Sequence, residues 1–123
     1  MNDKLKEITE TYIKAIDEKD LEGVLALSAD NFTLTDPDNF IDGKVAWGEF
    51  LEVLFNNEIT FKGIDVMADE DTSLLHFDLK VNKMHLRGVD VIKWENNKMI
   101  SLNAYLYEIK IQNQSPKNLT LPF

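Results

Sequence analysis

The 123-residue chain contains no cysteine. This absence excludes disulfide bonds, metal sites built on thiolates and a cysteine nucleophile. The first residues are already charged, with Asp3, Lys4, Lys6 and Glu7 in place of an apolar core, so a signal peptide is not expected. No apolar run approaches the roughly 20 residues that span a bilayer. We therefore expect a cytoplasmic protein without a membrane partner.

Positive charge is scarce as well. Lysine and arginine together number 13 against 22 aspartates and glutamates, which gives a formal net charge of -9. A surface of this sign repels phosphate backbones, so we expect no nucleic-acid partner. A content of 44% hydrophobic and 28% charged residues is typical of a globular protein. The length predicts one domain over residues 1–123, in which residues 112–123 form a polar tail.

The first half of the chain has the period of helices. Apolar residues recur at three- and four-residue spacing over residues 3–18, and Tyr12 lies on this inward stripe. Asp20 is placed to cap a short second helix, and Gly43 precedes a third helix with a broad apolar face. Between these two helices, Phe32–Thr35 predicts a brief strand.

From about residue 59 the apolar period changes to two, which predicts four consecutive strands. The expected inward residues include Ile64 in the first strand and Ile100 in the last. Asn82–Lys83 and Asn96–Asn97 are suited to tight hairpin turns. Helices followed by such a meander predict an α+β fold, with about three N-terminal helices packed on a curved, mixed or antiparallel sheet. A sheet folded around helices in this way forms a cone that encloses an apolar pocket.

Asp90 is out of place in this pattern. It lies between Val89 and Val91 in a run that predicts a buried strand. A carboxylate at such a position must be paired, reach water or keep its proton. In strand alternation Arg87 and Lys93 point to the opposite face, so neither is an easy partner. A carboxyl that keeps its proton can donate a hydrogen bond.

Five features occur in order along the chain: Tyr12 in the first helix, Leu21–Leu27, Asp36–Pro37, Gly43 before a helix, and Val89–Asp90–Val91. In this order and spacing the chain resembles the NTF2-like superfamily, and within it the ketosteroid isomerase (steroid Δ-isomerase) and SnoaL-like group. The resemblance covers about Leu5 to Tyr107. It implies the cone-shaped NTF2-like fold and, from the habit of that family, a homodimer.

The resemblance also implies roles for three residues. In the isomerases a tyrosine and a protonated aspartic acid stabilise an oxyanion, and an aspartate before a proline carries the proton. Matched position by position, these roles fall on Tyr12, Asp90 and Asp36. This chain departs from the isomerases in a shorter loop after Asp36, in Leu51 where a supporting tyrosine stands, and in Ser28 where the second helix usually has an aromatic residue.

Each of the three residues also has a structural explanation. Tyr12 can be a core residue whose hydroxyl bonds a backbone carbonyl. Asp36 before Pro37 can be a turn residue that accepts from backbone amides two residues on, and Asp38 fits that description better still. Asp90 can be a buried carboxylate paired with a cation or a helix terminus.

His76 and His85 are candidates for metal ligands or acid–base groups. Two isolated histidines without a third ligand at useful spacing make a weak metal site, so neither a metal nor a cofactor is expected. His85 shares a strand face with Arg87, opposite Asp90.

Three functions fit the sequence. The first is an isomerase-like enzyme that moves a proton α to the carbonyl of a small apolar ligand, with Asp36 as base and Tyr12 and protonated Asp90 as oxyanion donors. The second is a non-catalytic ligand-binding or dimerisation module. The third is a SnoaL-type cyclase or dehydratase that uses a carboxylate or a His–Asp pair in the same cavity. The fold alone does not rank them, since one scaffold hosts many activities.

Overall fold

The structure is a computed structural model and describes residues 2–111, so the predicted tail at 112–123 lies outside the described residues. Over these residues, three helices and six strands follow one another in the order that the sequence predicts, except for one short strand that the sequence did not indicate, β2. The elements in chain order are α1 (Asp3–Asp17), α2 (Leu21–Ala26), β1 (Ser28–Thr35), β2 (Phe40–Asp42), α3 (Lys44–Leu54), β3 (Ile59–Asp69), β4 (Thr72–Val81), β5 (Met84–Glu95) and β6 (Lys98–Ile111).

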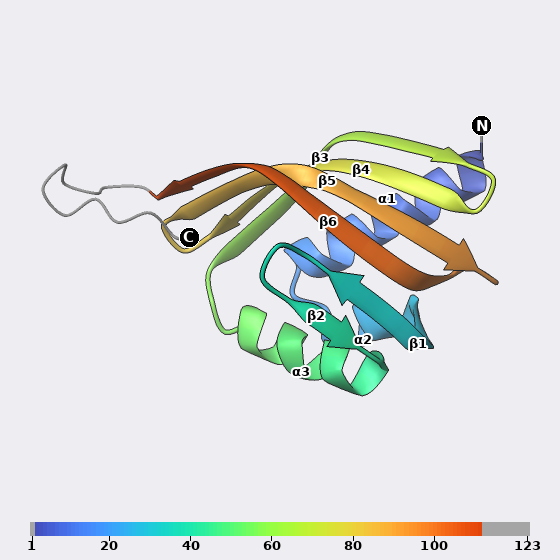
Figure 1. The fold of residues 1–123 in the computed structure, drawn as a ribbon, viewed down its shortest axis with the longest axis horizontal. Coiled ribbons are helices and arrows are strands. Elements are labelled where there is room, and N and C mark those ends of the chain that lie inside the picture. Colours follow the sequence, from blue (N-terminus) through green and yellow to red (C-terminus); the bar gives the residue numbers. More distant parts are fainter. Residues whose placement is uncertain (1, 112–123) are drawn as a thin grey trace, which may run out of the picture.

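The strands form one mixed sheet in the order β2-β1-β6-β5-β4-β3. Neighbouring strands are antiparallel except β1 and β6, which run parallel. Figure 1 shows the sheet curving over the helices, with α1 behind the long strands and α3 beside the β1–β2 end. The predicted α+β cone is therefore confirmed.

The helix boundaries follow local chemistry. The Asp20 side chain accepts a hydrogen bond from the Gly23 amide at 3.0 Å, which caps α2 as predicted. Gly43 has a φ of 96°, a left-handed value that a side chain rarely adopts, and it leads into α3. Asn82, Asn96 and Asn97 also have positive φ values, which allows the two tight turns of the meander.

The register of the sheet shifts at four places, through β-bulges or irregular pairing, and two predicted inward residues are wrong for this reason. The β3–β4 register shifts between Gly63 and Asp65, and Ile64 is 45% exposed. The β5–β6 register shifts between Lys93 and Trp94, and Met99 is buried where Ile100 was expected. A bulge adds one residue to one strand, so every later side chain changes face, and the strand bends.

Ser28 is the first residue of β1 and not part of the second helix as the sequence suggested. Its buried hydroxyl donates to the Val24 carbonyl at 2.8 Å and accepts from the Trp47 indole N–H at 3.0 Å. These bonds connect α2, β1 and α3 and orient the Trp47 ring, which packs on Phe32 and Phe50. Within residues 2–111, no helix is long and apolar enough to cross a membrane.

Candidate active site

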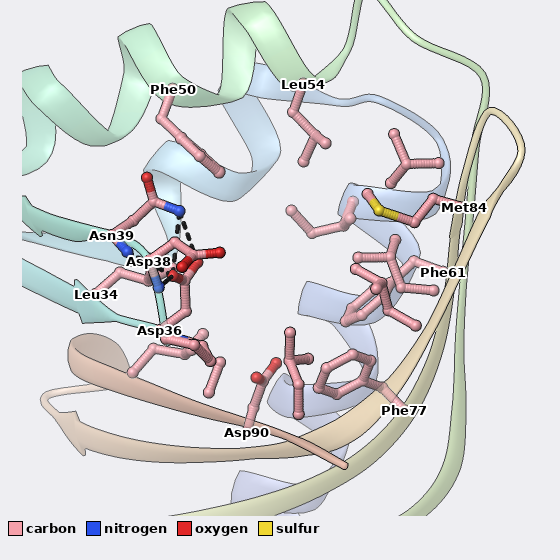
Figure 2. A pocket seen from close by; sticks show the side chains of 18 of the residues that line it. Leu34, Asp36, Asp38, Asn39, Phe50, Leu54, Phe61, Phe77, Met84 and Asp90 are labelled. Carbon is pink, nitrogen blue, oxygen red and sulfur yellow. Dashed lines mark hydrogen bonds between the residues drawn. The ribbon is translucent and has the colours of Figure 1, made fainter. Parts of the chain in front are cut away.

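The concave face of the sheet, α1 and α3 enclose a cavity of about 450 Å³. Figure 2 shows the polar groups of Asp36, Asp38 and Asn39 at one side and the side chains of Phe77 and Met84 at the other. Apolar side chains form most of the wall; they are Ile16, Leu34, Trp47, Phe50, Leu54, Phe61, Phe77, Leu79, Val81, Met84, Leu86, Leu102, Ala104, Leu106 and Ile109. A cavity lined in this way is suited to an apolar small molecule.

Tyr12, Asp36 and Asp90 all line this one cavity. They come from three separate elements: Tyr12 from the middle of α1, Asp36 from the residue after β1, and Asp90 from the middle of β5. The fold thus brings together the three residues that the sequence singled out, although they are 24 to 78 positions apart in the chain. Their chemical roles stay a prediction.

The Tyr12 side chain is 4% exposed, and its ring meets the ring of Phe61 edge-on at a centroid distance of 6.2 Å. Among residues 2–111, the hydroxyl has no hydrogen-bond partner, so the bond to a backbone carbonyl that the alternative structural explanation requires is not found there. Burial, and then the negative charge of Asp90, raise the pKa of the Tyr12 hydroxyl well above its usual value. The phenol therefore keeps its proton and can donate it in a hydrogen bond.

Asp90 is 4% exposed, and its carboxyl points into the cavity (Figure 2). As strand alternation predicts, neither Arg87 nor Lys93 is its partner. Arg87 Nε lies 3.4 Å from Asp78 Oδ2 and 3.6 Å from Glu108 Oε2 on the other face of the sheet.

Lys93 Nζ lies 3.8 Å from Asp71 Oδ1. Within the described part of the chain the Asp90 carboxyl has neither a hydrogen bond nor an ion pair. Burial, followed by the charge of Asp36, raises its pKa from 3.8 to about 8. With a pKa of about 8 the carboxyl is mostly protonated at pH 7 and can donate a hydrogen bond.

Asp36 is half-buried and closes the turn between β1 and β2. Its Oδ1 accepts from the amides of Asp38 at 2.8 Å and Asn39 at 2.7 Å, and from the Asn39 side chain at 3.1 Å. Its Oδ2 accepts from the same Asn39 nitrogen, also at 3.1 Å (Figure 2). The turn bonds that the sequence suggested are therefore present. Oδ1 accepts three hydrogen bonds and Oδ2 only one, so Oδ2 is the more available of the two oxygens.

Two residues beside Asp36 were not recognised as part of the site. Asn39 holds both oxygens of the Asp36 carboxylate, and Asp38, expected to be a turn residue only, also lines the cavity. Their sequence, Asp-Pro-Asp-Asn, predicts a turn but not which way that turn faces.

The two histidines lie elsewhere. His76 Nε2 is 2.7 Å from the Tyr107 hydroxyl, and His85 pairs with Asp78, both on the outer face of the sheet. Of the residues that the structure describes, no histidine lines the cavity. The same residues include no group of three or more His, Asp or Glu side chains arranged to hold a metal ion. A His–Asp pair inside the cavity, as the cyclase hypothesis allowed, is therefore not found in this part of the chain.

The fold and the site together define a largely apolar cavity in an α+β cone, with the buried Tyr12 hydroxyl, the buried Asp90 carboxyl and the hydrogen-bonded Asp36 carboxyl at its polar end. The sequence of residues 9–102 matches the model of the SnoaL-like domain family, and the chain therefore belongs to this family. The predicted membership of the SnoaL-like group is thereby confirmed. No functionally curated protein matches the chain.

Solved structures share this fold at low sequence identity. SalBIII, an epoxide hydrolase/cyclase-like enzyme of pyran ring formation in salinomycin, is 18% identical with a TM-score of 0.81, covering 89% of this chain and 96% of that one. A provisionally assigned ketosteroid isomerase from Kribbella flavida is 14% identical with a TM-score of 0.79, covering 98% and 90%. A computationally designed 17-OHP binder is 21% identical with a TM-score of 0.76, covering 87% and 96%.

Proposed function

We propose that this protein is an isomerase that moves a proton α to the carbonyl group of a small apolar ligand. The observation that carries the proposal is that the buried polar groups of Tyr12 and neutral Asp90, which have no partner within residues 2–111, share one cavity with the Asp36 carboxylate. Buried polar groups are nearly always hydrogen-bonded in native proteins. Two that face the same apolar cavity without a partner in the described chain are suited to a ligand oxygen.

The reaction divides between these residues. Asp36 Oδ2 removes a proton from the carbon next to the carbonyl group, and the electron pair of the broken C–H bond moves into a dienolate. The negative charge collects on the former carbonyl oxygen, which accepts hydrogen bonds from Tyr12 and from Asp90. Asp36 then returns the same proton to the far carbon of the dienolate, which shifts the double bond into conjugation. The enzyme ends in its starting protonation state.

The surroundings make the donors effective. The cavity wall is apolar, so little water competes for the oxyanion, and a hydrogen bond is stronger there than in solution. Both donors are neutral, so they bind the ground-state ketone without the cost of burying a charge. Asn39 acts as a positioning residue because it fixes both oxygens of the base.

The test is a spectrophotometric assay with a β,γ-unsaturated ketosteroid, whose conjugated product absorbs in the ultraviolet. Turnover by the wild-type protein supports the proposal. Absence of turnover, with binding of the same ketone measured by quenching of Trp47 fluorescence, would instead support the alternative of a non-catalytic binding module. The 17-OHP binder of the same fold makes that alternative concrete, because it holds its ligand by design.

Tyr12→Phe is expected to lower kcat by about 10²-fold, since it removes one of two hydrogen bonds to the oxyanion and keeps the ring in place. The measurement is steady-state kinetics in the same assay. Tyr105→Phe is a matched control, because Tyr105 is 62% exposed on the outer face of the sheet. Equal kcat values for Tyr12→Phe and wild type would contradict a donor role for Tyr12.

We also propose that two copies of the chain associate through the outer face of the sheet. Large apolar side chains are exposed there, among them Met67, Leu74, Tyr105 and Tyr107. Sedimentation velocity is expected to give twice the mass of the 14.2 kDa chain. A Tyr105→Lys variant should shift the protein toward monomer, and a wild-type monomer at 100 µM would contradict this association.

A further inference from the structure

The polar end of the cavity is acidic throughout. Its titratable lining residues are Tyr12, Asp36, Asp38 and Asp90. Of the residues that the structure describes, no lysine, arginine or histidine lines the cavity. The formal net charge of the chain is -9, so the electrostatic potential around the protein is negative, like that of the acidic residues at the polar end of the cavity.

Asp90 and Tyr12 add a second, independent feature. Each side chain is 4% exposed and lines the cavity, and within residues 2–111 neither polar group has a hydrogen-bond partner. The cavity thus presents at its polar end oxygens that can accept as well as donate hydrogen bonds, and apolar side chains such as Phe77 and Met84 at the other end (Figure 2). A ligand that satisfies both ends has a polar head and an apolar body.

The charge of that head decides how well it fits. A carboxylate or phosphate would lose its hydration and meet the Asp36 charge without any cation in the described lining to compensate. An ammonium group has three N–H donors and no acceptor, which matches the carboxyl and phenol oxygens of Asp90, Asp36 and Tyr12. Charge-assisted bonds of this kind are stronger than neutral ones.

We propose that this cavity binds lipophilic amines as ammonium ions, with the nitrogen held between Asp90 and Asp36, and that it rejects carboxylates of the same shape. The inference rests on the proposed function in placing ligands in this cavity, but it requires no catalysis. An amine held in this way occupies the position of the ketone and blocks it.

Binding of the cation is coupled to loss of a proton from Asp90. The described titratable groups that face Asp90 are Tyr12 on α1 and Asp36 after β1, while its cross-strand neighbours, Leu75 on β4 and Ala104 on β6, carry no charge. Because the pKa of Asp90 in the free protein is about 8, the carboxyl must release a proton to pair with an ammonium at pH 7. A neutral ligand has no such requirement.

The experiment is isothermal titration calorimetry with three probes that share one ring system: 1-naphthylmethylamine, 1-naphthylmethanol and 1-naphthoic acid. At pH 7 we expect the amine to bind at least tenfold more tightly than the alcohol, and the acid to bind at least tenfold more weakly. Titrations in buffers of different ionisation enthalpy should show nearly one proton released per amine bound and none per alcohol. Equal affinities for amine and alcohol without proton release, or preference for the acid, would overturn the proposal.

Substitutions locate the effect. Asp90→Asn is expected to weaken amine binding at least tenfold and alcohol binding less than threefold. Asp30→Asn makes the same substitution at an exposed position on β1 and should change neither. Proton release is measured on the wild-type protein, so the proposal remains testable even if Asp90→Asn folds poorly.

The outcome is separable from that of the isomerase assay. Ketone turnover without a preference for the amine would overturn only the amine proposal. Amine binding with proton release, but without ketone turnover, would overturn isomerisation and leave the amine site standing. With both present, the amine should be a competitive inhibitor of the ketone that becomes about tenfold weaker for each pH unit below 7.

Discussion

Asp36→Asn is expected to lower kcat for ketone isomerisation by about 10⁴-fold with little change in KM, since a general base contributes up to this factor and an amide has no basic lone pair. The turn should survive the change. The oxygen of the Asn side chain can still accept from the amides of Asp38 and Asn39, which are now bonded to Asp36 Oδ1. Loss of turnover would therefore report on chemistry and not on folding.

The measurement is steady-state and single-turnover kinetics of the purified variant, with its circular dichroism spectrum compared with that of the wild type. Asp42→Asn is the matched control, because Asp42 is an exposed aspartate on β2 close in sequence. A retained kcat within tenfold of the wild-type value would exclude Asp36 as the base. Proton transfer would then have to be assigned to another carboxylate that lines the cavity, and Asp38 is the nearest one in sequence.

Periodicity predicted the order of the elements because the apolar stripe of α1 and the alternation in β4 each have one buried face. In β4, Leu75 and Phe77 are buried and Leu79 and Val81 line the cavity, as the pattern requires. Such patterns are local, so a sequence contains them in full.

The bulges escaped prediction because they depend on the partner strand. The β5–β6 register shifts between Arg87 and Gly88, and as a result Leu106 and Ile109 face the cavity although they are three residues apart. Strict alternation would have placed Ile109 on the opposite face. One end of the cavity is therefore formed by residues whose orientation is decided by strand pairing and not by their own sequence.

The candidate site was accessible from the sequence in part. Tyr12 and Asp90 are noticeable because they interrupt apolar patterns, and that interruption is itself a physical signal of a group that needs a partner. Asn39 gave no such signal, since asparagine is ordinary in a turn and its contact with Asp36 appears only once the turn is built. Strand alternation already indicated that Arg87 and Lys93 do not pair with Asp90, and the structure pairs both with other carboxylates. Only the structure shows that no other cation of the described chain pairs with Asp90.

The raised pKa of Asp90 carries a cost in stability that depends on pH. An aspartate in the unfolded chain ionises near 3.8, whereas Asp90 in the folded protein ionises at about 8. Between these two pH values only the folded state binds the proton. The free energy of unfolding therefore falls by roughly 1.4 kcal/mol for each unit by which the pH rises. The contribution of the protonated Asp90 to the free energy of unfolding is fully present below pH 3.8 and is lost as the pH rises through 8.

Asp90→Asn should remove this dependence, because an amide has nearly the same shape as the neutral acid and no charge to bury. We expect the variant and the wild type to have similar free energies of unfolding near pH 4, and the variant to be more stable by up to about 5 kcal/mol at pH 9. Urea denaturation followed by tryptophan fluorescence from pH 4 to 9 measures the difference. Asp30→Asn, on an exposed side chain, controls for the change in net charge.

A wild-type stability that does not fall between pH 5 and 8 relative to Asp90→Asn would mean that Asp90 is ionised in the folded protein. An ionised Asp90 could not donate to an oxyanion, so the same result would remove one of the two donors from the proposed mechanism. If the stability difference between wild type and Asp90→Asn does grow with pH, the Asp90 carboxyl destabilises the fold when it is ionised. In that case Asp90→Asn should also abolish the coupling of amine binding to proton release. Stability, proton release and turnover would then all depend on one proton, held by Asp90 in the middle of β5.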